Sequence, residues 1–167
     1  GVCAEPKRVY PKGELAPQLL GFVGGDTYAG LAGLELQYDE LLSGEPGESQ
    51  VVSDLKGNRL STVSVKEAVP GESLHLTIDA EIQFETERVL AQTVEEFGAK
   101  KACAVVIEPA TGEVLAMANT PVCDTNGYAA ASLAESDRRN MVVTDQYEPG
   151  ATFKMVAVAA ALEEGIV

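Results

Sequence analysis

Residues 147–154 read Tyr-Glu-Pro-Gly-Ala-Thr-Phe-Lys, and an apolar stretch follows them up to residue 164. Proline and glycine at positions 149 and 150 favour a turn, so the sequence predicts a helix over residues 152–164 that begins directly after it. Apolar residues lie nearly all round this helix, and we therefore expect it to be buried on every side. Because the few residues that follow cannot supply all its neighbours, the chain is predicted to be cut off inside a larger domain.

The turn places residue 151 at the amino end of the helix. Unpaired N–H groups and the helix dipole favour negative charge there, which would assist an alkoxide nucleophile and a developing oxyanion. Lys154 lies one turn later on the same face, so a serine at position 151 would have a lysine within reach as its base. The residue present is Ala151, which has no nucleophilic atom. Taken alone, Lys154 also fits a helix-terminal lysine that reaches a backbone carbonyl.

Upstream of this turn, residues 102–107 and 114–118 form two apolar runs joined by Glu-Pro-Ala-Thr-Gly-Glu. The pattern predicts a tight antiparallel hairpin whose strands are both buried on both faces. Residues 124–140 are richer in Asn, Gly, Ser, Asp and Arg, with only a weak helical period at 129–133. We expect irregular structure in that segment.

Before the hairpin, the sequence predicts a strand followed by a helix. The alternation of Leu74, Leu76 and Ile78 with polar residues is typical of a half-buried strand. Asp79 is a suitable N-cap, and Gly98 a suitable C-terminal stop, for the helix between them. The predicted apolar face of this helix consists of Ile82, Thr86, Val89, Leu90, Thr93 and Phe97.

The first third of the chain alternates glycine-rich turns with short apolar stretches. Apolar residues at helical spacing predict a short amphipathic helix over residues 31–42, which Gly44 ends. Residues 56–59 read Lys-Gly-Asn-Arg and predict a hairpin turn between two strands. A further strand at 63–65 is expected to lead to a turn at Pro70 and Gly71. Strands and helices together indicate an α+β protein.

With a serine at position 151, residues 151–154 would read Ser-x-x-Lys, the first motif of penicillin-binding proteins and class A β-lactamases. The surrounding segments resemble class B penicillin-binding proteins, the monofunctional transpeptidases of cell-wall synthesis. They read Leu-Thr-Ile-Asp at 76–79, Ala-Val-Val-Ile-Glu-Pro at 104–109 and Thr-Gly-Glu-Val-Leu-Ala-Met at 111–117. Segments that look like the family's non-catalytic pedestal, or dimerisation domain, are Tyr-Pro at 10–11, Leu-Gly-Phe-Val-Gly at 20–24, Gly-Leu-Glu at 33–35 and Tyr-Asp at 38–39.

The resemblance implies the C-terminal part of a pedestal in residues 1–70. It implies the N-terminal, incomplete portion of a transpeptidase domain, an antiparallel sheet with helices, in residues 71–167. By the same resemblance, Ala151 stands at the position of the nucleophile serine and Lys154 at that of the general base. Asn140 either orients the active-site region or serves a local turn.

The function that the resemblance implies is that of an enzyme on the extracytoplasmic face of the cell membrane. Such an enzyme cross-links peptidoglycan stem peptides through an acyl-serine intermediate, which β-lactams trap. The parent would be anchored by an N-terminal membrane helix that these residues lack. No cofactor or metal is implied, and residues 1–70 are expected to contact cell-wall assembly proteins.

The departures from the family matter as much. Its later motifs, Ser-x-Asn and Lys-Thr-Gly or Lys-Ser-Gly, appear nowhere in the sequence, and Ser-Asp-Arg at 136–138 only approximates the former in the wrong order. We therefore expect a fragment that cannot acylate. The alternatives are a natural pseudoenzyme whose pedestal is an interaction module, and a small standalone binding domain. The last would expose the apolar final helix, where we expect self-association or cover by another chain.

Composition excludes some partners. The net charge of -14, from 12 Lys and Arg against 26 Asp and Glu, would repel phosphate backbones and anionic lipid headgroups, so nucleic acid is not expected. The acidic residues form no long block, and we interpret them as solvated surface. No apolar stretch approaches the ~18 residues that a membrane helix needs.

Isolated reactive residues carry little weight. The three cysteines, Cys3, Cys103 and Cys123, support neither a disulfide framework nor a zinc site; Cys103 is expected to be buried, and a bridge to Cys123 stays open. Residues 53–56 repeat the Ser-x-x-Lys spacing, but no helix follows them, so we assign them no function. His75 is interpreted as a surface or hydrogen-bonded histidine rather than a ligand or base.

Overall fold

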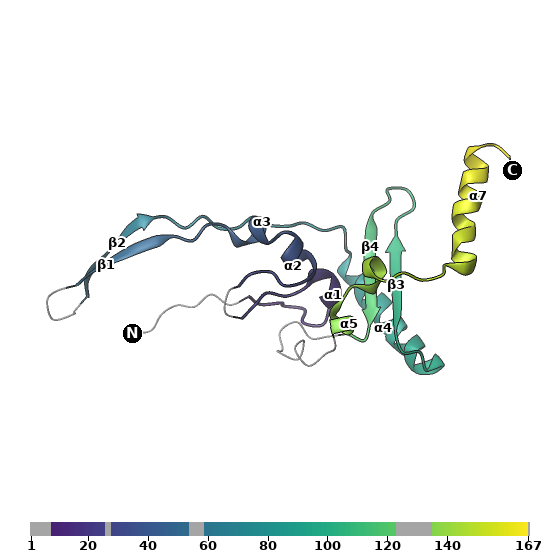
Figure 1. The fold of residues 1–167 in the computed structure, drawn as a ribbon, viewed down its shortest axis with the longest axis horizontal. Coiled ribbons are helices and arrows are strands. Elements are labelled where there is room, and N and C mark those ends of the chain that lie inside the picture. The colour runs from purple at the N-terminus through teal and green to yellow at the C-terminus, as the bar shows by residue number, and fades with distance from the viewer. Residues whose placement is uncertain (1–7, 26–27, 54–58, 123–134, 167) are drawn as a thin grey trace.

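The computed structural model describes residues 8–25, 28–53, 59–122 and 135–166. The chain is elongated: a two-stranded ribbon, β1 and β2, extends from one end, and a second hairpin, β3 and β4, lies near the other with helix α4 beside it (Figure 1). Short helices α1, α2 and α3 lie between the two hairpins. Helices and antiparallel strands occur together in this arrangement, which confirms the predicted α+β class.

Three short helices form the middle of the chain: α1 at Pro17–Leu20, α2 at Gly33–Gln37 and α3 at Asp39–Ser43. The single helix predicted over 31–42 is therefore wrong in one respect, because it breaks at Tyr38, whose ψ of 25° ends α2 before α3 begins. The Asp39 carboxylate stabilises the interruption between α2 and α3 by accepting the Gly30 N–H at 2.8 Å. Gly44 ends α3 with a φ of 63°, as predicted.

The ends of α1 and α2 meet backbone to backbone. Gly21 has a φ of 79°, and a Cβ atom added there would lie 1.8 Å from the carbonyl oxygen of Ala32. Only glycine fits this position without a shift of the backbone, because it combines a left-handed conformation with a close approach.

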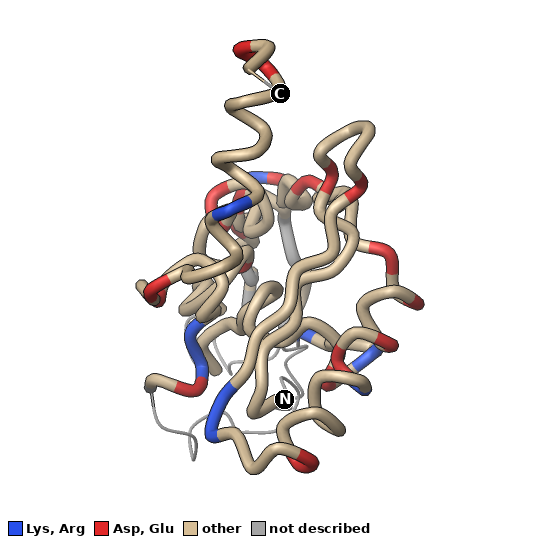
Figure 2. The backbone as a smooth tube through the Cα atoms, turned by 90° about the vertical axis from the view of Figure 1, so that its right-hand side faces the viewer, with Lys and Arg blue, Asp and Glu red and all other residues tan. Residues whose placement is uncertain are grey.

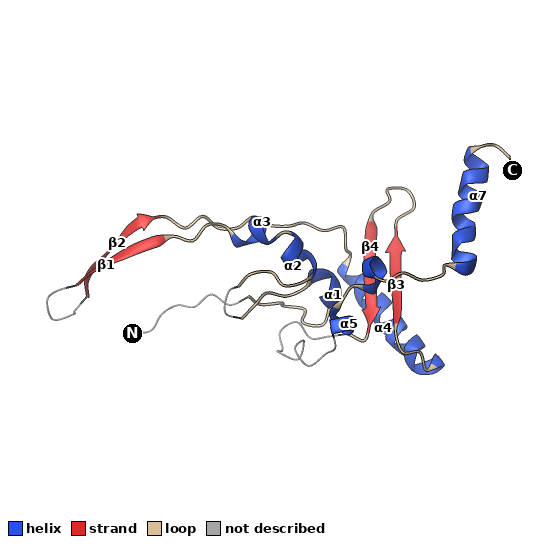
Figure 3. Ribbon diagram, viewed as in Figure 1, coloured by secondary structure: helices blue, strands red, loops and turns tan. Residues whose placement is uncertain are grey.

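The first hairpin pairs β1, Glu48–Ser53, with β2, Arg59–Lys66 (Figure 3). The two predicted strands around residues 56–59 are confirmed as an antiparallel pair, while the turn itself lies outside the described residues. The strand predicted at 63–65 is part of β2 rather than a separate element. Exposed side chains such as Leu60, at 67%, and Val65, at 61%, show that the ribbon is solvated.

Helix α4, Ala80–Phe97, begins and ends where the sequence predicts. The Asp79 carboxylate caps it by accepting the N–H groups of Glu81 and Ile82, and Gly98 ends it in a left-handed conformation. Five residues of the predicted apolar face, Ile82, Thr86, Val89, Leu90 and Thr93, do share one face and line a hollow beside Ala104 of β3. That face is only partly buried, and the prediction missed the residue that is most buried. The helix turns Gln83, which is fully buried, toward the sheet, whereas Phe97 is 75% exposed.

The strand predicted from Leu74 to Ile78 is wrong: these residues form no strand, and the backbone bends at Thr77. Two hydrogen bonds tie its end to β4: Thr77 Oγ1 donates to the Val114 carbonyl at 2.7 Å, and Asp79 N–H donates to the Leu115 carbonyl at 2.9 Å. Thr77 already reaches Val114, the first residue of β4, so residues 74–76 have no β4 residue left to pair with.

The second hairpin pairs β3, Ala102–Ile107, with β4, Val114–Thr120, and confirms the predicted antiparallel pair. The prediction that both strands are buried on both faces is wrong for β3. Ala116 and Ala118 of β4 are buried, but Val105 is 40% and Ile107 52% exposed. Helix α4 packs mainly on β4, so the alternate side chains of β3 face solvent.

The last segments are α5 at Glu135–Arg138, α6 at Met141–Thr144, the 3₁₀ turn η2 at Gly150–Phe153 and α7 at Lys154–Glu163. The irregular segment predicted over 124–140 thus contains a short helix, α5, while the weak period at 129–133 lies outside the described residues. Helix α7 confirms the predicted helix but not its burial: Met155 is 69% and Leu162 62% exposed. No other described element covers its faces, and it stands apart from the sheet in Figure 1.

The distribution of acidic residues and the apolar character of the helices match what the sequence predicts. Figure 2 shows acidic positions scattered along the backbone rather than gathered in one block. Among the described helices, none combines the length and the apolar character that crossing a membrane would require.

Candidate active site

The predicted Pro-Gly bend is present at the start of the last helix. Gly150 adopts a φ of 52°, a left-handed conformation that favours glycine. The Pro149 carbonyl accepts the Thr152 N–H at 3.0 Å, which closes the first turn. This first turn is a 3₁₀ turn, η2, and α7 continues it without interruption.

Ala151 and Lys154 lie on one turn of this helical segment. The Lys154 N–H donates to the Ala151 carbonyl, so the two residues are joined by the backbone hydrogen bond that defines a 3₁₀ turn. Side chains three residues apart eclipse each other in such a turn, which places both on the same face. Both residues are exposed to solvent. The geometry is what a base one turn after a nucleophile needs; the roles themselves stay a prediction.

Asn140 lies at the start of α6 and contacts other elements. Its carbonyl accepts the N–H groups of Val143 and Thr144 at 3.1 Å each. Its side-chain Nδ2 donates to the sulfur of Met117 at 3.0 Å, and its Oδ1 accepts from Asn119 Nδ2 at 3.0 Å. These contacts join α6 to β4, and none of the described hydrogen bonds joins Asn140 to Ala151 or Lys154.

The sequence did not single out Gln83, although the structure gives it a central place. Its Oε1 accepts the Met117 N–H at 2.7 Å, and its Nε2 donates to the Met117 carbonyl at 3.1 Å. This side chain therefore makes the two hydrogen bonds that a neighbouring strand would make at the outer edge of β4. The available signal was the spacing of Asp79, Gln83 and Glu87, which form a polar row at i, i+4 and i+8.

Glu87 was missed as well. Its Oε1 accepts the Ala16 N–H at 2.8 Å and the Gln83 Nε2 donor at 2.7 Å. Burial raises the pKa of the Glu87 carboxyl above its ordinary value, and these hydrogen bonds lower it by less. Gln18, which is 5% exposed, adds a second link between α1 and this half of the chain by donating to the Pro121 carbonyl at 2.7 Å.

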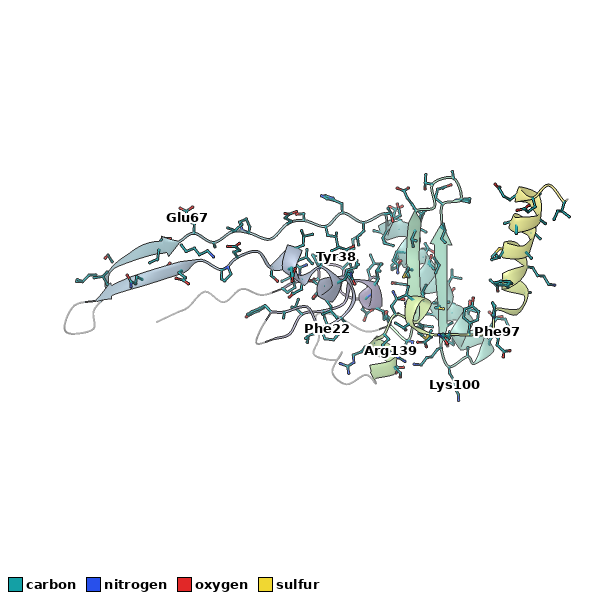
Figure 4. The ribbon with its side chains drawn as sticks, turned by 45° about the horizontal axis from the view of Figure 1, so that its top comes forward. Phe22, Tyr38, Glu67, Phe97, Lys100 and Arg139 are labelled. Carbon is teal, nitrogen blue, oxygen red and sulfur yellow. The ribbon has the colours of Figure 1, made fainter. Side chains whose placement is uncertain are left out.

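A cavity of about 660 Å³ lies where α1 and α2 meet β4, α5 and α6. Phe22 and Arg139, both among its lining residues, lie at this junction in Figure 4. The Nε atom of Arg138, in the same lining, is buried and has no hydrogen-bond partner among the described residues. Neither Ala151 nor Lys154 lines the cavity, which is therefore separate from the nucleophile turn.

The remaining reactive residues are placed as follows. Cys103 is a free thiol on the exposed face of β3, which corrects the prediction that it is buried. Cys3 and Cys123 lie outside the described residues, as do Lys56 and the side chain of Ser53. Within the described ranges, no group of three or more His, Cys, Asp or Glu residues is arranged to hold a metal ion.

Two family models match the sequence. The penicillin binding protein transpeptidase domain matches residues 102–167. The penicillin-binding protein dimerisation domain matches residues 2–76. The two matches follow each other along the chain and leave all of α4 between them.

Known proteins align along nearly the whole chain. Peptidoglycan D,D-transpeptidase FtsI of Escherichia coli (strain K12) is 36% identical over 163 residues, which are 98% of this chain and 27% of FtsI. The chain thus spans about a quarter of the length of that relative.

Solved structures agree with this match. Penicillin Binding Protein 2X from Streptococcus thermophilus superposes with a TM-score of 0.76 at 30% identity, over 93% of this chain and 24% of that protein. A chain from a structure described as the structural coordination of polymerization and crosslinking by a peptidoglycan synthase complex gives 0.77 at 28% identity, over 95% of this chain and 33% of that one.

Proposed function

Since the chain belongs to the class B penicillin-binding proteins, we propose that it is part of a peptidoglycan D,D-transpeptidase whose nucleophile has been replaced by alanine. The observation that carries the proposal is the shared face of Ala151 and Lys154 at the amino end of α7, directly after a Pro-Gly bend.

In the parent, a serine hydroxyl at position 151 attacks the carbonyl of a D-alanyl-D-alanine stem peptide. Lys154 accepts the hydroxyl proton, and the terminal D-alanine leaves with a proton as its amine forms. The amine of a second stem peptide then attacks the acyl-serine, which forms the cross-link and frees the serine. N–H groups at the helix start favour the negative charge that develops on the nucleophile.

The 167 residues themselves do not acylate in this proposal. Ala151 offers no oxygen to the substrate, and the sequence contains neither Ser-x-Asn nor Lys-Thr-Gly. Incubation of the chain with a fluorescent penicillin should leave it unlabelled, both as it is and with Ala151→Ser. Labelling of the Ala151→Ser chain would show that the later motifs are not needed and would overturn this part of the proposal.

We further propose that residues 1–70 form the pedestal portion and residues 71–167 the transpeptidase portion. No helix and no strand lies between β2 and α4, where the only regular pairing is the isolated bridge of Val69 with Glu45, and this supports a boundary in that stretch. Peptidoglycan stem peptides and β-lactams are the proposed ligands of the parent, on the extracytoplasmic face of the membrane. Cell-wall assembly proteins are the proposed partners of residues 1–70, which agrees with the resemblance to a chain of a peptidoglycan synthase complex.

The second candidate function is that of a pseudoenzyme that serves cell-wall assembly without catalysis. Ala151 is the observation that favours it, because a natural alanine at this position removes acylation and leaves the pedestal unchanged. The codon at position 151 of the natural gene decides between the two. A serine codon supports the transpeptidase, and an alanine codon supports the pseudoenzyme.

A further inference from the structure

A chain of hydrogen bonds runs from α1 across α4 to β4. The Ala16 N–H donates to Glu87 Oε1 at 2.8 Å, and Gln83 Nε2 donates to the same oxygen at 2.7 Å. Gln83 then binds both backbone groups of Met117, the N–H at 2.7 Å and the carbonyl at 3.1 Å. One residue of the N-terminal half is thereby linked to strand β4 of the other half.

The chain continues from β4 to the segment that precedes the nucleophile turn. Asn140 Nδ2 donates to the Met117 sulfur at 3.0 Å, and the Asn140 carbonyl accepts the first N–H groups of α6, those of Val143 and Thr144. Only residues 145–149 separate α6 from η2 and Ala151. The position of Asn140 therefore sets where the segment leading to Ala151 begins.

The buried hydrogen bonds of this series leave their side chains few other conformations. Gln83 is 0% exposed and uses both its amide hydrogens and its oxygen, so that its amide can have only one orientation. Ala16 is 5% exposed and adopts a φ of 51°, which is unfavourable for a residue with a Cβ atom. If α1 moves away from α4, the Ala16 N–H and the Glu87 carboxylate lose each other as partners.

Buried polar groups that lose a partner must find another or return to water. Glu87 would regain solvent most easily by turning away from Gln83, and Gln83 would then lose one of the contacts that fixes its amide against Met117. The next hydrogen bond in the series is the one from Asn140 to Met117.

We propose that Glu87 and Gln83 are positioning residues, which make the start of α6 depend on whether α1 is seated against α4. The importance of this coupling for acylation rests on the proposed function. The coupling itself is a property of the described residues and is tested without any acylation.

The experiment is amide hydrogen exchange, residue by residue, on the 167-residue chain and its variants. Glu87→Leu removes the link to Ala16, and Glu87→Gln keeps an oxygen that can accept from both Ala16 and Gln83. Glu96→Leu is the matched control, because Glu96 is an exposed glutamate near the end of the same helix. The amides of Val143 and Thr144 report on α6, and the amide of Val106 in β3 reports on opening of the hairpin.

In Glu87→Leu, exchange at Val143 and Thr144 should accelerate roughly tenfold, the order expected when a hydrogen bond to a charged group is lost. Exchange at Val106 should change much less, Glu87→Gln should restore protection, and Glu96→Leu should change nothing. Equal acceleration at all three amides, or no change at residues 143 and 144, would overturn the coupling.

Gln83→Met breaks the next link and should accelerate exchange at residues 143 and 144 at least as much as Glu87→Leu does. Exchange at Val106 should also rise in this variant, because Gln83 binds β4 directly, and unchanged exchange at residues 143 and 144 would overturn the coupling. If both Glu87→Leu and Gln83→Met fail to fold, the proposal is also wrong, because these residues would then hold the whole fold rather than one segment. Failure of the proposed transpeptidase function would appear only in penicillin labelling, so the two results are separable.

Discussion

Replacing Gln83 by leucine tests whether one buried amide replaces a strand at the edge of β4. The change keeps the approximate size of the side chain but removes three hydrogen bonds, two of them to the backbone of Met117. Each backbone group left unpaired in the interior costs about 1–3 kcal/mol. A buried leucine offsets roughly 1–2 kcal/mol of that sum through its apolar surface.

We therefore expect Gln83→Leu to lower the free energy of unfolding by about 2–3 kcal/mol, which for a chain of this size lowers Tm by roughly 5–10 °C. Urea unfolding followed by far-ultraviolet circular dichroism measures the change. Gln92→Leu is the matched control, because Gln92 lies on the exposed side of α4 and accepts only from Arg88 on the helix surface. That control should cost within about 0.5 kcal/mol of zero.

Equal destabilisation by the two variants would refute the reasoning, since the buried contacts to Met117 would then contribute nothing beyond what a surface glutamine contributes. A stabilising Gln83→Leu would refute it more strongly, because it would mean that the edge of β4 finds water or another partner without cost.

Three further predictions follow from other parts of the chain. Gly21→Ala should lower Tm by more than Gly112→Ala: both glycines have a φ near 80°, but an added Cβ meets the Ala32 carbonyl in the first case and open space in the second; thermal unfolding of the two variants compares them. The raised pKa of Glu87 means that its contribution to stability is present below about pH 4.5, the ordinary pKa, and is lost as pH rises through the folded-state pKa. The free energy of unfolding, measured across that pH window, should therefore fall less steeply with rising pH in Glu87→Gln than in the unaltered chain. Identical slopes would contradict the assignment. Val158→Lys, on the exposed α7, should reduce self-association measured by sedimentation velocity, and an unchanged profile would show that this helix is not the contact.

Features set by neighbouring residues could be predicted from the sequence. The start of α4 at Asp79, its end at Gly98 and the turn before Ala151 depend on capping and on glycine conformations, which act within a few residues. The two hairpins were predictable for the same reason, because alternation and turn residues are local signals.

Features set by contacts between distant segments could not be predicted. The buried face of α4 carries Gln83 and Glu87 because the edge of β4 and the N–H of Ala16 supply their partners, and apolar periodicity alone cannot show that. Residues 74–78 have the alternation of a strand but lack a ladder, since β4 begins only at Val114, the residue that Thr77 contacts. The exposed faces of β3 and α7 likewise depend on which elements pack on them.

Of the candidate site, the sequence predicted the position of Ala151 and Lys154 on one helical turn, and the structure has that turn as 3₁₀ rather than α. The contacts of Asn140 with Met117 and Asn119 were beyond sequence reasoning, because they join residues more than 20 positions apart.

The central claim is that position 151 is the site of a nucleophile served by Lys154. Its most direct test is labelling by a fluorescent penicillin, followed by mass spectrometry of the labelled peptide, on the full gene product with Ala151→Ser. The account predicts an acyl group on residue 151, no label when alanine occupies that position, and loss of labelling when Lys154→Met is added. Labelling at another residue, or undiminished labelling with Lys154→Met, would contradict it.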